Sequence, residues 1–96
     1  MKFKSEKVNQ NKMFCLGKDI VRGEYIMAIT VCEIAWYQQY FSISKEEFDL
    51  YEEKLDEFMN IYNECISSLS GSYRFLCSDK VKENTPQQLE RLREGK

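Results

Sequence analysis

The sequence predicts a small α+β domain in which an antiparallel sheet of about three strands packs against one long amphipathic helix, with a short helix near the C-terminus. Two apolar runs before residue 36 suit strands, residues 43–71 show the 3.6-residue period of a helix, and residues 85–88 start a second helix. Ninety-six residues with 43% hydrophobic content can bury one modest core. We therefore expect a single domain over residues 1–96.

The first third of the chain predicts a polar arm followed by a hairpin. Residues 1–11 are rich in Lys, Asn and Gln and suit a loosely ordered N-terminal arm or a short edge strand around Phe3. Residues 12–20 are apolar in the middle and suit a strand. Residues 25–35 are rich in β-branched side chains and apolar at both parities, as in a central strand buried on both faces. Gly23 can take a positive φ, so we expect an antiparallel turn there.

A dense aromatic cluster, WYQQYFSI, fills residues 36–43. The segment either extends the preceding strand or forms a bend or short helical turn. One interpretation is that its aromatic side chains cover the end of the core beneath the long helix. The other is that one or two of them stand exposed beside that helix as interface anchors, a role in which Trp and Tyr are common. The side chains concerned are Trp36, Tyr37, Tyr40 and Phe41.

The principal helix is expected over residues 43–71. Ser44 and Glu47 have the spacing of a capping box at its start, and Gly71 is a suitable stop at its end. Apolar side chains between these signals recur every three or four residues and form one stripe that faces the core. That stripe consists of Phe48, Tyr51, Leu55, Phe58, Met59, Tyr62 and Ile66.

A short strand over residues 73–77, a polar loop over residues 78–84 and a second helix complete the expected order β-β-α-β-α. The second helix begins with Thr85 as N-cap, Pro86 at the first helical position and Gln88 as the capping-box partner.

The chain carries no catalytic signature. Its four cysteines are spaced 17, 33 and 12 residues apart, with no CxxC pair, and each lies in an apolar stretch, so we expect buried free thiols. The chain has no histidine, which argues against a zinc site or a histidine base. It also has no GxSxG motif, P-loop or glycine-rich phosphate cradle. We expect a protein that is not an enzyme and needs neither cofactor nor metal.

No segment predicts a membrane span. The longest apolar run, residues 25–32, is well below the roughly 18 to 20 residues that cross a bilayer. The basic N-terminus lacks the hydrophobic region of a secretory signal, so we expect a cytoplasmic protein with no membrane partner.

Charge is distributed unevenly although the net charge is only −2. Residues 1–22 hold six basic and two acidic side chains, whereas residues 44–64 hold two basic and eight acidic ones. The acidic residues gather on the helix face opposite the apolar stripe. Same-sign neighbours four residues apart destabilise an isolated helix by roughly 1 kcal/mol in total. This face consists of Glu46, Asp49, Glu53, Asp56, Glu57 and Glu64.

The acidic face is either a solvated surface or a docking site for a cationic partner. Leu50 and Ile61 point toward it, and aliphatic side chains among acids suit a steered, partly apolar interface. The other explanation for these two residues is that the C-terminal segment folds over them. An acidic face repels nucleic acid, so we expect a basic protein as the partner. The candidate partner-binding residues are Glu46, Asp49, Leu50, Glu53, Asp56, Glu57, Trp36 and Tyr37.

A small, motif-free α+β chain with an acidic helix face and nearby aromatic residues resembles the bacterial immunity proteins of toxin–immunity pairs, including those of contact-dependent growth inhibition. The resemblance implies selective, tight binding to the toxic domain of a cognate effector, often a basic nuclease. It also implies neutralisation by covering the toxin's active site with carboxylates and aromatic side chains. The residues that carry it are Trp36, Tyr37, Tyr40, Glu46, Asp49, Glu53, Asp56 and Glu57.

Two alternatives from other classes stay open. The chain can be a structural or regulatory subunit, for instance a homodimer, that associates through the aromatic cluster at residues 36–41. It can also be an accessory protein that binds nucleic acid weakly through its basic ends.

Overall fold

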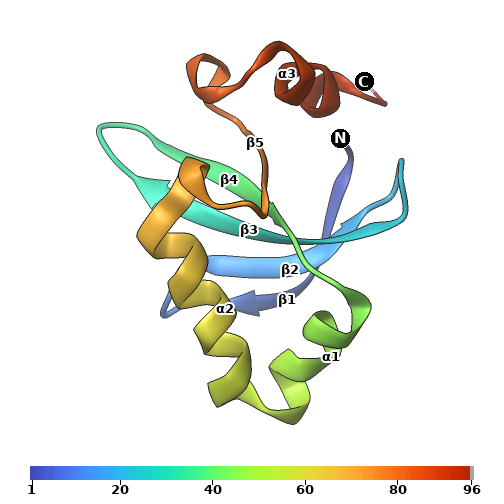
Figure 1. The fold of residues 1–96 in the computed structure, drawn as a ribbon, viewed down its shortest axis with the longest axis vertical. Coiled ribbons are helices and arrows are strands. Elements are labelled where there is room, and N and C mark those ends of the chain that lie inside the picture. Colours follow the sequence, from blue (N-terminus) through green and yellow to red (C-terminus); the bar gives the residue numbers. More distant parts are fainter. Residues whose placement is uncertain (96) are drawn as a thin grey trace.

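The computed structural model describes residues 1–95 and shows a five-stranded antiparallel sheet covered by helices on both faces (Figure 1). The sheet is a meander with the strand order β1-β2-β3-β4-β5. Its strands are β1 (Phe3–Asn9), β2 (Phe14–Asp19), β3 (Glu24–Cys32), β4 (Trp36–Ser42) and β5 (Phe75–Ser78). The helices are α1 (Lys45–Glu53), α2 (Leu55–Ser68) and α3 (Pro86–Arg93), with the 3₁₀ turns η1 (Leu69–Gly71) and η2 (Val81–Glu83).

The α+β class and the antiparallel sheet are confirmed, but the sheet has five strands rather than about three. Residues 3–9, in the segment expected to be a loosely ordered arm or a short edge strand, form the edge strand β1, which pairs with β2. The aromatic segment neither extends β3 nor bends. It forms β4, which turns back beside β3 so that Trp36 faces Cys32 across the pair.

The expected single helix over residues 43–71 is wrong, because the chain breaks at Lys54 into α1 and α2. Lys54 has φ −146° and ψ 77°, outside the helical region. Its amide closes α1 on the Leu50 carbonyl at 2.8 Å, and its own carbonyl accepts from Phe58 at 3.1 Å to begin α2. Side chains from both helices pack into the same core on one face of the sheet. Tertiary packing here overrides a strong local helix pattern.

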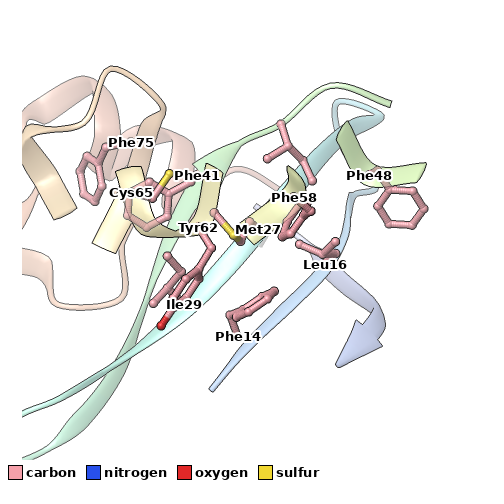
Figure 2. Packing of buried hydrophobic residues seen from close by; sticks show 11 residues of the cluster. Phe14, Leu16, Met27, Ile29, Phe41, Phe48, Phe58, Tyr62, Cys65 and Phe75 are labelled. Atoms are coloured by element: carbon pink, nitrogen blue, oxygen red, sulfur yellow. The ribbon is translucent and has the colours of Figure 1, made fainter. Parts of the chain in front are cut away.

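The larger core lies between the sheet and the α1–α2 layer. Figure 2 shows this cluster running along the sheet from Phe75 at one end to Phe48 at the other. Phe14 forms its aromatic centre, with ring centroids 4.7 Å from Tyr62 and 5.9 Å from Phe58. Aromatic pairs at these spacings add stabilisation beyond their buried area. The buried members are Phe14, Leu16, Met27, Ile29, Phe41, Ile43, Phe48, Phe58, Tyr62, Cys65 and Phe75.

A smaller core on the opposite face lies beneath α3. Its buried members are Met1, Ile26, Ala28, Tyr40, Cys77 and Leu92. β3 therefore contributes to both cores, as expected for a central strand apolar at both parities. Arg91 of α3 pairs with the fully buried Asp19 at 3.2 Å and ties the helix to the end of β2.

Two glycines have contrasting surroundings. A Cβ at Gly17 on β2 would lie 2.8 Å from the backbone carbonyl carbon of Lys4 and still closer to its oxygen. With any larger residue at position 17, β1 would therefore have to move away from β2. Gly71 has no atom within 4 Å of its Cβ position. Gly23, in the turn before β3, has φ +70° as predicted.

We expect Gly17→Ala to lower the free energy of unfolding by about 1 to 3 kcal/mol, because the added methyl forces β1 away from β2. Urea unfolding measures the loss, and amide hydrogen exchange should show it concentrated in β1. The control Gly71→Ala adds the same methyl in open space and should stay within about 0.5 kcal/mol of the parent. Equal effects of the two variants would contradict the close approach at Gly17.

Candidate functional site

The break at Lys54 makes a convex corner where α1 meets α2, on the opposite side of the molecule from α3 in Figure 1. Every residue from 52 to 57 is exposed there. We call the acidic corner the set Glu52, Glu53, Leu55, Asp56 and Glu57.

Half of the carboxylates at the acidic corner are neutralised locally. Glu52 pairs with Lys7 at 3.3 Å, and Glu57 with Lys54 at 3.7 Å. Glu53 and Asp56 form no ion pair with any side chain in residues 1–95. Two uncompensated negative charges therefore remain on a protruding surface, where they attract cations.

The other predicted acidic residues lie along α1. Glu46 is exposed in the first turn of α1, where the helix dipole favours a carboxylate. Asp49 is half-buried and pairs with Lys45 at 2.8 Å. Glu47 turns the other way, completing the predicted capping box with Ser44. Of these three α1 acids outside the acidic corner, Glu46 is the only one that is exposed and forms no ion pair within residues 1–95.

Leu50 and Ile61 are not the exposed aliphatic residues that the single-helix pattern indicated. Both are partly buried and pack against the core of the α1–α2 layer, and the C-terminal helix lies on the opposite face of the sheet. Leu55 is instead 46% exposed and Ile66 38% exposed. Leu55 therefore takes the place that was expected for Leu50, at the centre of the acidic corner.

Trp36 and Tyr37 point to opposite faces of β4, as neighbours on a strand must. Tyr37 shares its face with Gln39 and donates its hydroxyl proton to Glu83 at 2.8 Å. Burial together with the Glu83 carboxylate raises the pKa of Tyr37 to about 12. Trp36 is 68% exposed on the face that carries α3. The structure therefore does not bring either aromatic residue to the acidic corner.

The rest of the aromatic cluster is core. Tyr40 is buried beneath α3, and Phe41 is fully buried beneath α2. The interpretation that these residues cover the core holds for Tyr40 and Phe41, whereas Trp36 is exposed away from the acidic helices.

Glu83 is a partly buried polar residue that the sequence pattern did not single out. It accepts hydrogen bonds from Ser78 Oγ at 2.7 Å, from Gln39 Nε2 at 3.0 Å and from Tyr37. Burial alone would raise the pKa of Glu83, but these donors lower it below the ordinary value. The arrangement anchors η2 to the sheet, and no local sequence signal could have predicted pairings more than 40 residues apart.

The cysteines are unpaired thiols, but only Cys65 and Cys77 are fully buried. Cys15 is half-buried and Cys32 is exposed, which corrects the expectation of burial for all four. Burial raises the pKa of Cys77 to about 11, so this thiol is a poor nucleophile at neutral pH. Within residues 1–95, no three Cys, Asp or Glu side chains converge in a way that could hold a metal ion.

Across the described part of the chain, every helix is too short or too polar to span a bilayer. Comparisons with protein-family models, with curated proteins and with solved structures give no match.

An ion pair joins the first turn of α1 to the segment before β5. Arg74 donates from Nη1 and Nη2 to the two carboxylate oxygens of Glu47 at 2.8 and 2.6 Å, and from Nη1 to the Ser42 carbonyl at 3.1 Å. Arg74 is the main reason that the pKa of Glu47 lies below its ordinary value of 4.5, although partial burial opposes the shift. The bidentate geometry makes this pair stronger than the exposed pairs of the corner.

We expect Glu47→Gln to lower the free energy of unfolding at pH 7 by about 1 to 3 kcal/mol, because it leaves Arg74 partly buried without its counter-charge. The depressed pKa contributes stability above pH 4.5, and this contribution is lost as the pH falls through the folded-state pKa. The gap between parent and variant in urea unfolding should therefore narrow from pH 7 to pH 3. Glu57→Gln, at an exposed pair, should change stability by less than about 0.5 kcal/mol at either pH. A pH-independent gap for Glu47→Gln would contradict the ionic contribution.

Proposed function

We propose that this chain is a protein-binding inhibitor that docks on a basic surface of another protein through its acidic corner. The observation that carries the proposal is the exposed Leu55 lying beside two unpaired carboxylates, Glu53 and Asp56, on a convex corner. An apolar centre that loses water on binding, surrounded by charges that guide the approach, is the usual anatomy of a specific interface.

The convex shape indicates what kind of partner surface fits. A corner between two helices can enter a cleft, whereas it makes little contact with a flat surface. Clefts that bind polyanions are lined with Lys and Arg, because they must neutralise phosphates. An acidic corner seated in such a cleft would compete directly with a nucleic acid substrate. A nuclease is therefore the partner class that the charge and the shape of the corner match best.

Within that class, we propose that the chain is an immunity protein that neutralises a cognate nuclease toxin. This proposal accounts for the exposed Glu53, which lies one helical turn after the like-charged Asp49 in α1 and has no ion pair within residues 1–95, whereas Asp56 also lies in the first turn of α2, where the helix dipole favours a carboxylate.

The first test is affinity capture from the native host with the tagged chain at moderate salt. We expect one stoichiometric, basic partner whose expression alone is toxic and whose co-expression with this chain is tolerated. Recovery of no partner, or of a partner whose activity is unchanged in the complex, would overturn the inhibitor proposal.

With the captured partner in hand, Glu53→Lys and Asp56→Lys should each slow association by about tenfold at low salt, and the difference should shrink as salt rises. Surface plasmon resonance measures both rates. The control is Glu90→Lys, which makes the same charge change on an exposed residue of α3, on the other face of the sheet. If Glu90→Lys slows association as much as the corner variants do, the effect is one of net charge and the corner is not the docking site.

We also expect Leu55→Asp to speed dissociation by at least about tenfold while changing association little, since it removes the apolar centre but keeps the negative field. Leu55 is 46% exposed, so its replacement should leave the thermal unfolding temperature within a few degrees of the parent. Unchanged dissociation would show that the partner contacts only the charges.

A further inference from the structure

The face of the sheet that carries α3 is only half covered. The helix is eight residues long and packs over Ile26, Ala28 and Tyr40, near the end of the sheet where Arg91 meets Asp19. In Figure 1 it lies beside the N-terminus and the turn between β2 and β3, away from the tip of the β3–β4 hairpin. Over the other half of this face, toward the β1–β2 and β3–β4 turns, no helix of residues 1–95 lies.

We call this half the open sheet surface. Its side chains come from four neighbouring strands and one turn, and they surround a hollow of 310 Å³. None of the side chains that line the hollow carries a formal charge, although 31% of the whole chain is charged. The principal members are Val8, Met13, Cys15, Thr30, Trp36 and Gln38.

The open sheet surface holds both a hollow and a protrusion. Val8 is 63% exposed on one side of it, and Trp36, the only tryptophan of the chain, is 68% exposed on the other. Ile34 lies in the adjoining turn between β3 and β4 and is fully exposed. Glu33 and Lys80, the charged residues at this tip, neutralise each other at 3.0 Å. A large aromatic side chain therefore stands at the rim of an uncharged hollow.

We propose that the open sheet surface binds a second copy of this chain, forming a weak two-fold dimer. A two-fold interface needs a patch that is complementary to itself, so that residue i meets j and j meets i. That condition is met when Trp36 of each protomer enters the hollow of the other protomer. A charged or polyanionic ligand finds no opposite charge among the described side chains that line the hollow, whereas the same hollow in a second copy meets no repulsion from them.

The distribution of charge across the molecule also favours a second copy. The acidic residues lie on α1 and α2, which cover the opposite face of the sheet. Two copies joined at their open sheet surfaces therefore keep their acidic layers apart and directed outward. This dimer leaves both acidic corners accessible, so it is independent of the proposed inhibitor function and would make that inhibitor bivalent.

The small extent of the surface sets the expected affinity. It takes only one or two residues from each of four strands together with the turn between β1 and β2, so we expect an interface smaller than the roughly 800 Å² per partner of a standard stable interface. We therefore expect dimerisation with a dissociation constant on the order of 10 to 100 μM.

Sedimentation velocity over a concentration series, together with the emission of the single Trp36, tests the proposal. We expect the sedimentation coefficient to rise and the emission to shift to shorter wavelength in parallel, because dimerisation takes Trp36 out of water. Trp36→Lys and Val8→Lys, both at exposed positions, should weaken dimerisation at least tenfold while retaining the parent's circular dichroism. The control Leu55→Lys places a charge on an exposed aliphatic residue of the other layer and should dimerise like the parent.

A protein that stays monomeric up to 500 μM, or that dimerises equally well as Trp36→Lys and Val8→Lys, would overturn the proposal. A shift of Trp36 emission only when a different protein is added would overturn it too, because the occupant would then not be a second copy. Either result leaves the inhibitor proposal standing, since that is tested at Glu53 and Asp56 on the opposite layer.

Discussion

The structure depends on the need to cover both faces of β3. Ile26 and Ala28 point to one side of the strand and Met27 and Ile29 to the other, and all four are fully shielded from solvent. One face receives the 23 helical residues of α1 and α2, and the other only the eight residues of α3. A helix this short cannot be held by apolar burial alone, and the buried pair between Arg91 and Asp19 joins it to the sheet. Such a pair adds little net stability, but loss of one partner would leave a buried charge that costs about 3 to 5 kcal/mol.

The same constraint explains the break at Lys54. A straight helix from residue 45 to residue 68 would present one narrow stripe, which suits a groove better than a broad sheet. Two shorter helices at an angle cover more of the sheet and turn Leu50 and Ile61 inward. The break also leaves Lys54 and Leu55 at a protruding corner. The acidic corner is therefore a consequence of how the larger core is covered.

Local signals predicted the elements that depend on local chemistry. The structure confirms three predictions of this kind: the capping boxes at Ser44 and Thr85, the positive φ of Gly23 and the two-sided burial of β3. The features that the sequence did not show depend on contacts between residues distant in the chain. β1 is a strand because β2 lies beside it, and the helix breaks at Lys54 where α1 and α2 both pack against the sheet. The candidate site followed the same division. The acidic residues are helical as predicted, but they lie on two helices rather than one, and Leu55 rather than Leu50 is the exposed aliphatic residue among them.

The structure separates the aromatic and acidic residues that the sequence analysis had assigned to one candidate binding site. Trp36 and Glu53 belong to surfaces on opposite sides of the sheet, so one partner contacting both would have to wrap around the sheet, for instance at the edge formed by β1. That edge carries a bulge between Ser5 and Lys7 together with the charges of Lys4 and Lys7, features that discourage pairing with another strand. Two surfaces, each with its own occupant, are therefore the simpler arrangement. The acidic corner is charged and attracts its partner over a range that decreases as the salt concentration rises. The open sheet surface is uncharged and interacts only on contact. Because the exposed side chains chosen for substitution on the two surfaces are not among the buried core residues, each surface can be altered there without disturbing the core that positions both.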